Sequence, residues 1–192
     1  LGLVYTGFVH DELDGERWER HPQVEGNVYV KELEKDWIHP PSTVMVTSEA
    51  LSEVGGFNTD LPTREDYELW LRVTEQFTVA YVNDLLVTKR EQSDSLSKDF
   101  DQRIEGDLAV YDEVRRRIEE LNLDAVQRHR IHSTHHLVIG RDYESNGNRR
   151  KAVSHLSRAV AQVNAWAMLV IALFGIDRNG WLLTRVKRVL WS

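Results

Sequence analysis

The chain has 192 residues, 41% hydrophobic and 29% charged, so it can bury a core as one domain or as one domain with an appendage. No run of about 20 apolar residues occurs, which argues against a membrane span, and the lack of cysteine excludes disulfides and thiolate metal sites. The net charge of -7 is uneven: residues 1–124 carry 28 acidic and 13 basic side chains, and residues 125–192 carry 3 and 11. The basic part shows neither zinc-ligand spacing nor an obvious recognition helix, so no nucleic-acid partner is expected.

The first elements alternate between strand and helix. The β-branched and aromatic residues of 1–9, LGLVYTGFV, predict a strand, and a polar turn follows at 10–16. A helix around 28–38 must end before the prolines at 40 and 41, because a residue that precedes proline avoids helical geometry. A strand at the first residues is not a usual chain start, so we expect the front half of a larger domain to precede it.

The middle of the chain continues this alternation up to about residue 97. TVMVTS (43–48) predicts a short strand, and EALSEV (49–54) predicts a brief helix that Ser48 caps and Gly55 closes. A helix over 64–77 and strands at 77–82 and 85–90 follow. Two charge-rich helices are expected at 98–121 and 124–145, so everything beyond residue 97 is predicted to be helical.

The helix predicted over 64–77 carries an acidic residue on its apolar side. At about 100° per residue, Asp66 falls inside the apolar stripe, whereas Glu65 falls on the polar face. Burial there disfavours a charged carboxylate, but the first-turn N–H groups and the helix dipole favour it. An ionised and poorly hydrated carboxylate in this position would be a good general base.

A purely structural interpretation of Asp66 stays open beside this one. Residues 63–66, TRED, resemble a capping box with Asp in place of the usual Glu or Gln, in which Asp66 would only satisfy a backbone N–H. Glu65 is then a solvated charge. Glu68 and Arg72, four residues apart on the polar face, predict a surface ion pair.

Residues 41–97 resemble the acceptor half of family 2 glycosyltransferases, which are inverting enzymes with the A-type nucleotide-sugar fold. The matching segments follow the family's order and spacing: PSTVMVTSEALSEVGGFN (41–58), EDYELWLRV (65–73) and LLVTKREQSDSLS (85–97). The resemblance implies an α/β fold class, with residues 1–97 forming the C-terminal half of an A-type fold. Residues 98–192 would then be an all-helical tail.

The resemblance also implies an activity and its residues. The family's catalytic base corresponds to Asp66, with Glu65 beside it, and we assign four candidate substrate-binding residues around it: Trp70, Arg64, Arg90 and Thr43. The expected reaction transfers a sugar from a nucleotide-sugar donor to a glycan or lipid-linked acceptor hydroxyl with inversion. The Gln-x-x-Arg-Trp motif of processive relatives is missing, so one sugar is expected per reaction. Adjacent carboxylates that diverge on a helix make a poor glycosidase pair.

The metal site that the family implies is not expected in this chain. The family holds Mg²⁺ or Mn²⁺ with an Asp-x-Asp motif, but Asp99-Phe100-Asp101 opens a polar helix here, so we assign no metal ligand and expect the ion to be bound mainly upstream. Lys89-Arg90-Glu91-Gln92 replaces the family's Tyr-Arg-x-His, and Arg90 would supply positive charge instead. The histidines within 129–136 are interpreted as surface residues.

The helical tail has a signal of its own. The small and apolar residues between Ile139 and Ala159 follow the spacing of a tetratricopeptide-type helix hairpin, although the position of its terminal proline is Asn164. A helix pair that packs against the transferase part is favoured over a peptide-binding array. A noncatalytic helical adaptor that carries a degenerate transferase half is the alternative function.

The C-terminal residues predict contact with a membrane surface. AWAMLVIALFGI (165–176) would rise only about 18 Å as a helix, too short to span. Within the end segment 177–192, residues 181–191 combine an apolar face and a basic face and are bracketed by two tryptophans, as interfacial helices are. We therefore expect a cytoplasmic protein held peripherally at an anionic inner leaflet. The alternative is that both segments only cap the helical tail against the core.

Overall fold

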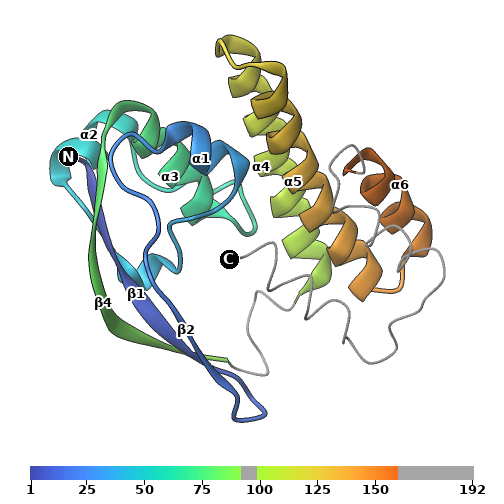
Figure 1. The fold of residues 1–192 in the computed structure, drawn as a ribbon, viewed down its shortest axis with the longest axis horizontal. Helices are drawn as coiled ribbons and strands as arrows, with labels where there is room; N and C mark the ends of the chain where they lie inside the picture. Colours follow the sequence, from blue (N-terminus) through green and yellow to red (C-terminus); the bar gives the residue numbers. More distant parts are fainter. Residues whose placement is uncertain (92–98, 160–192) are drawn as a thin grey trace. The chain divides into compact units, whose positions relative to one another are not determined.

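The computed structural model describes residues 1–91 and 99–159 (Figure 1). It divides into two units, Leu1–Leu123 and Asp124–Ser192. The predicted boundary after residue 97 differs from this division, because helix α4 (Phe100–Glu120) belongs to the first unit. Within the described ranges, no helix combines the length and apolarity needed to cross a membrane.

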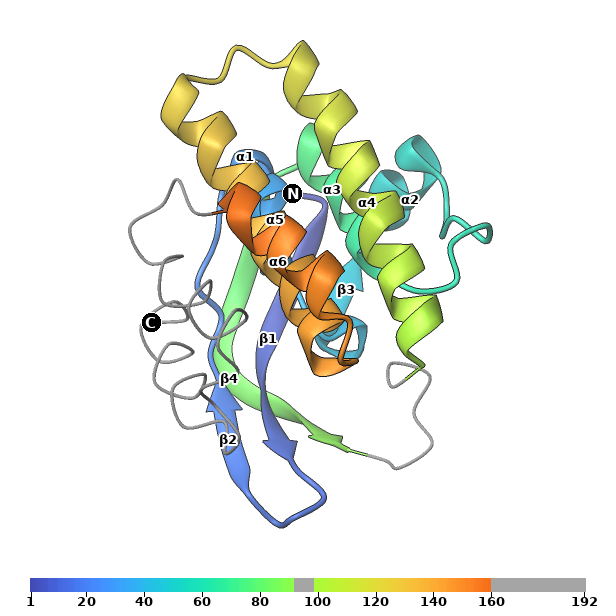
Figure 2. The same ribbon diagram turned by 90° about the vertical axis from the view of Figure 1, so that its right-hand side faces the viewer.

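A small mixed sheet forms the centre of the first unit, in agreement with the predicted α/β class. Strand β1 (Leu3–Asp11) pairs in antiparallel fashion with β2 (Arg17–Arg20) and β3 (Val44–Val46), and in parallel with β4 (Val79–Arg90). Strand β2 pairs with the end of β1 and β3 pairs with its beginning, both along one edge of β1. Strand β4 pairs along the opposite edge of β1 (Figure 2).

Strand β4 is continuous where the sequence predicted two strands. Its register against β1 shifts, so that Val82 faces Thr6 but Leu85 faces Gly7. A Cβ atom on Gly7 would lie 2.7 Å from the Arg20 carbonyl oxygen and 2.8 Å from Leu85 Cδ2. The irregularity therefore needs glycine at this point of β1.

Three short helical elements precede the site helix. Helix α1 (Tyr29–Glu34) is shorter than predicted, the 3₁₀ turn η1 spans Pro41–Thr43, and α2 covers Ser48–Val54. The cap of α2 is Thr47 rather than Ser48, since the Thr47 hydroxyl accepts a hydrogen bond from the Ala50 amide. Gly55 ends α2 with φ 83°, as the sequence predicted.

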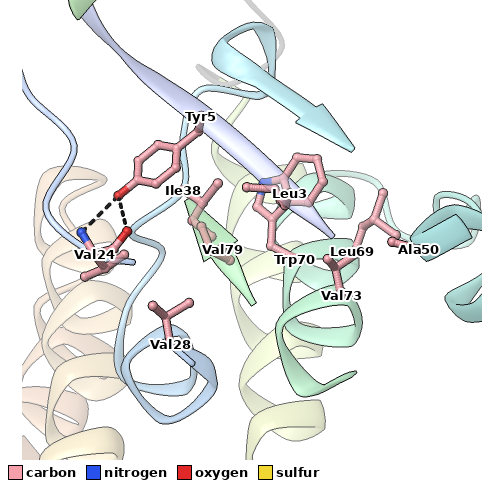
Figure 3. Close-up of a cluster of buried hydrophobic side chains, with 10 residues drawn as sticks. All are labelled: Leu3, Tyr5, Val24, Val28, Ile38, Ala50, Leu69, Trp70, Val73 and Val79. Carbon is pink, nitrogen blue, oxygen red and sulfur yellow. Dashed lines mark hydrogen bonds between the residues drawn. The ribbon is translucent and has the colours of Figure 1, made fainter. Parts of the chain in front are cut away.

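Helix α3 (Glu65–Gln76) packs its apolar stripe against β1 and β4. Figure 3 shows this core, whose members are Leu3, Tyr5, Val24, Val28, Ile38, Ala50, Leu69, Trp70, Val73 and Val79. The Tyr5 hydroxyl donates to the Val24 carbonyl at 3.0 Å and accepts from the Val24 amide at 3.0 Å, so it is satisfied, whereas the buried Trp70 Nε1 has no hydrogen-bond partner among the described residues. The core fixes the direction of α3 and thereby the position of its first turn.

The described part of the second unit is a helix pair. Helix α5 (Ala125–Ser145) begins with a capping box from Asp124 and Gln127 and packs on α6 (Arg149–Ala159). A Cβ atom on Gly140 would lie 2.8 Å from the Leu156 side chain, so glycine permits close helix contact. The predicted helix pair is thus present, whereas Asn164 and the segments 165–176 and 177–192 lie outside the described residues.

Candidate functional site

The first turn of α3 places the predicted base at the edge of the core. Tyr67, Leu69, Leu71 and Val73 are buried, Asp66 is half-buried, and Glu65 is exposed. The apolar residues of the predicted stripe are thus buried, and so is Glu68, which was predicted on the polar face. The two adjacent carboxylates have different environments, and only that of Asp66 is partly removed from water.

The turn that precedes α3 does not form the predicted capping box. The residue at the helix start is Arg64, which adopts left-handed geometry (φ 67°, ψ 15°), and no side chain caps the helix there. Asp66 Oδ1 accepts instead from the Tyr67 amide at 2.8 Å. A left-handed conformation costs a residue other than glycine about 1–2 kcal/mol, and such residues often occur at functional sites.

Arg64 forms ion pairs with two carboxylates from other parts of the chain. Its Nε lies 2.6 Å from Asp107 Oδ1 on α4, and its Nη1 lies 3.9 Å from Asp36 Oδ2 in the loop after α1. Burial opposes the guanidinium charge, but Asp107 and Asp36 outweigh it and raise the pKa of Arg64. The charged form of Arg64 is therefore fixed beside Asp66.

Asp36 is a second carboxyl group within electrostatic reach of Asp66. Its side chain is 19% exposed, and Oδ1 is buried with no hydrogen-bond partner among the described residues. Burial and the negative charge of Asp66 raise the pKa of Asp36 to about 7, against the opposing charges of Arg64 and Arg20. The protonated form of Asp36 is therefore favoured beside the predicted base.

A chain of polar contacts connects Asp36 to strand β2. His39 Nδ1 lies 3.2 Å from the Asp36 carbonyl oxygen and 3.8 Å from Asp36 Oδ2, and its Nε2 lies 2.7 Å from Arg20 Nη1. Burial and the neighbouring Arg20 lower the pKa of His39 to about 3, so the ring is neutral. A neutral ring accepts from Arg20 at Nε2 and donates from Nδ1 to the Asp36 carbonyl.

Glu32 on α1 interacts with Asp36 and with the first turn of α3. It is fully buried, and Oε1 accepts from the Trp37 amide at 3.2 Å. Its carbonyl oxygen accepts from the Tyr67 hydroxyl at 2.6 Å, which ties α1 to the first turn of α3. Burial, with the charge of Asp36 acting in the same direction, raises the pKa of Glu32 well above its usual range.

The four predicted substrate-binding residues have different environments. Trp70 is 3% exposed within the core, and Thr43 is 4% exposed with its hydroxyl donating to the Pro40 carbonyl at 2.8 Å. Arg90 is exposed at the far end of β4, opposite Asp11. Only Arg64 lies in the cluster. Burial leaves Trp70 and Thr43 no surface to offer a substrate, so we do not retain them in that role.

The ion pair between Glu68 and Arg72 is more buried than the sequence suggested. Arg72 Nε and Nη2 lie 2.8 and 2.7 Å from the two Glu68 oxygens, and Glu68 is 8% exposed. The same guanidinium donates to the carbonyls of Val54 at 2.5 Å and Gly56 at 2.8 Å. The pair therefore joins α3 to the end of α2 rather than lying free on the surface.

The site is a poor one for the metal ion that the family resemblance implies. Asp36 and Asp107 are both paired with Arg64, whose positive charge would oppose a bound cation. Asp99 caps α4, accepting from the amides of Asp101 and Gln102, so DFD (99–101) is a helix start as predicted. Among the described residues, the one acidic group with metal-binding spacing is Glu12, Asp14 and Glu16 in the exposed β1–β2 turn.

The histidines of the second unit are less exposed than predicted. His135 is buried, and His136 Nδ1 lies 3.2 Å from His155 Nδ1 on α6. Burial and the charge of His155 lower the pKa of His136 to about 4. The two imidazole rings form a hydrogen bond between the two helices.

Sequence reasoning missed Asp36, Asp107, Arg20 and His39. Gly106, inside a long helix, was the one available signal, because a helical glycine often marks a close approach of backbone. Comparisons of the chain with protein-family models, curated proteins and solved structures find no match.

Proposed function

We propose that this chain is the acceptor-side half of an inverting glycosyltransferase and that Asp66 is its general base. The observation that carries the proposal is the half-buried Asp66 in the first turn of α3, beside the fixed charge of Arg64 and the second carboxyl group of Asp36. Strongly shifted neighbouring carboxyl groups are typical of sites that move protons. The family resemblance of residues 41–97 supports the same reaction class.

The proposed reaction needs one base. The acceptor hydroxyl loses its proton to Asp66 as its oxygen attacks the anomeric carbon of the donor sugar. The bond from that carbon to the nucleoside diphosphate breaks, and the diphosphate leaves with the electron pair. No covalent sugar–enzyme intermediate forms, and the anomeric configuration inverts.

The neighbours of Asp66 suit this role. Arg64 places a positive charge beside Asp66, and the raised pKa of Asp36, about 7, favours its protonated form, which limits repulsion between the two carboxyl groups. The helix dipole and the Tyr67 amide stabilise the same carboxylate. A divalent ion would stabilise the leaving diphosphate in this class of enzyme, but the residues around Arg64 do not fit one.

Acceptor-dependent release of nucleoside diphosphate tests the proposal. The complete protein that contains this chain is incubated with uridine, guanosine and thymidine diphosphate sugars, Mn²⁺, and saccharide or polyprenyl phosphate acceptors. We expect that one of the donors releases its nucleoside diphosphate, and that it does so only when an acceptor is present. This release should be lost in Asp66→Asn. Equal release without any acceptor, or in the Asp66→Asn variant, would contradict transfer by this site.

The alternative is a noncatalytic adaptor that uses its helices to bind a partner. The burial of Trp70 favours this alternative, because an indole in the core cannot line a sugar pocket beside Asp66. The adaptor predicts no diphosphate release with any donor in the panel. The half-buried Asp66 beside Arg64 and Asp36 favours the enzyme, because clusters of this kind are typical of sites that move protons.

A further inference from the structure

Helix α4 lies outside the segment that resembles a transferase, yet it contacts the turn that begins α3. The Thr63 hydroxyl donates to the Gln102 carbonyl at 3.1 Å. A Cβ atom on Gly106, one turn later, would lie 2.6 Å from the Thr63 carbonyl oxygen and 2.2 Å from its hydroxyl oxygen. The backbone of α4 therefore rests directly on the turn, and any side chain at position 106 would displace it.

Asp107, the next residue of α4, contacts Arg64, the residue that follows Thr63 in this turn. Asp107 is 8% exposed, and its Oδ1 accepts from Arg64 Nε at 2.6 Å. Arg64 has the left-handed geometry that residues other than glycine avoid, so something outside the turn must hold it there. The Arg64 carbonyl oxygen accepts a hydrogen bond from the Glu68 amide at 3.0 Å, and this bond closes the first turn of α3 around Asp66.

We propose that Asp107 and Gly106 of α4 are positioning residues for Asp66, acting through Thr63 and Arg64. The inference rests on the proposed function for its catalytic meaning, but its structural part can be measured in the chain alone. Asp107 acts through Arg64, and it fixes the turn from which the Asp66 carboxylate projects. Residue 63 is 39 positions from Gln102, so this coupling depends on the fold and not on local sequence.

The first arm of the test measures amide hydrogen exchange in residues 1–192. Asp107→Leu and Gly106→Ala should each speed exchange of the Tyr67 and Glu68 amides at least about tenfold, and Asp107→Asn, which keeps an acceptor oxygen, should show a smaller change. Asp112→Asn is the matched control, because Asp112 is an exposed acid on the same helix. It should leave these amides unchanged.

A double variant separates positioning through Arg64 from general stabilisation of α4. In an Arg64→Met background, Asp107→Leu should add less than about a twofold change at Tyr67 and Glu68, because the residue through which it acts is gone. A full additional effect in that background, or faster exchange confined to α4 amides, would overturn the proposal.

The second arm measures kinetics in the complete protein. Asp107→Leu should lower kcat about 10²-fold, the cost of roughly 1 Å of misplacement, with the donor KM changed less than about threefold. Unchanged kcat alongside faster exchange would overturn the catalytic part. If the wild type transfers no sugar but the exchange results hold, the proposed function fails and the positioning of the turn stands.

Discussion

Replacing Asp66 with asparagine in the complete protein should lower turnover by about 10²–10⁴-fold, the range expected when a general base is lost. Asparagine keeps an oxygen that can accept from the Tyr67 amide, so the first turn of α3 should stay folded. The donor KM should change little, because the removed group acts on the acceptor hydroxyl. Initial rates of diphosphate release measure the effect.

Glu65→Gln is the matched control for that substitution. Glu65 is adjacent in sequence and equally acidic, but its side chain is exposed on the polar face of α3. We expect less than about a tenfold change in turnover. A loss as large as that of Asp66→Asn, or undiminished turnover in Asp66→Asn itself, would remove the assignment of the base.

Replacing Asp36 with asparagine should stabilise the protein at pH 8. The folded pKa of Asp36 is about 7, above the ordinary value of 3.8, so the folded chain holds a proton that the unfolded chain has lost. The contribution of Asp36 to the free energy of unfolding therefore falls as pH rises from about 4 to 7 and stays low above that range. About three pKa units correspond to at most about 4 kcal/mol.

Urea unfolding at several pH values checks this result. Asp36→Asn should unfold at a higher urea concentration than wild type at pH 8 and at a similar one at pH 4. Asp60→Asn, which removes an exposed acid, should follow wild type throughout. A variant that is equally less stable at both pH values would mean that Asp36 is charged in the folded protein and held there by Arg64.

Much of the first unit follows from local patterns. The burial of Leu69 and Val73 on α3 is predictable because helix periodicity places them on one face with Asp66, whereas the burial of Glu68 on the polar face is not. Strand β2 was missed because RWER (17–20) lies in a hairpin whose side chains are largely exposed and show no alternation. Strand β4 was divided because Asn83-Asp84 resembles a turn, whereas a bulge beside Gly7 carries the strand past it.

The cluster around Asp66 is less predictable. Asp36 lies in a loop without periodicity, and Asp107 lies among the other charges of a polar helix, 43 positions from the Arg64 it contacts. Neither residue differs in sequence from its solvated neighbours, since only tertiary packing brings them to Arg64. The left-handed geometry of Arg64 was equally hidden, because a preference for that region is usual only for glycine and, less often, asparagine or aspartate.

The stereochemistry of transfer tests the central claim most directly. The anomeric configuration of the first product is read by NMR, and the intact mass of the protein is recorded during turnover. A base at Asp66 predicts a product inverted relative to the donor and no sugar attached to the protein. A product with retained configuration, or a sugar ester on Asp66, would show a nucleophile instead and would contradict the account.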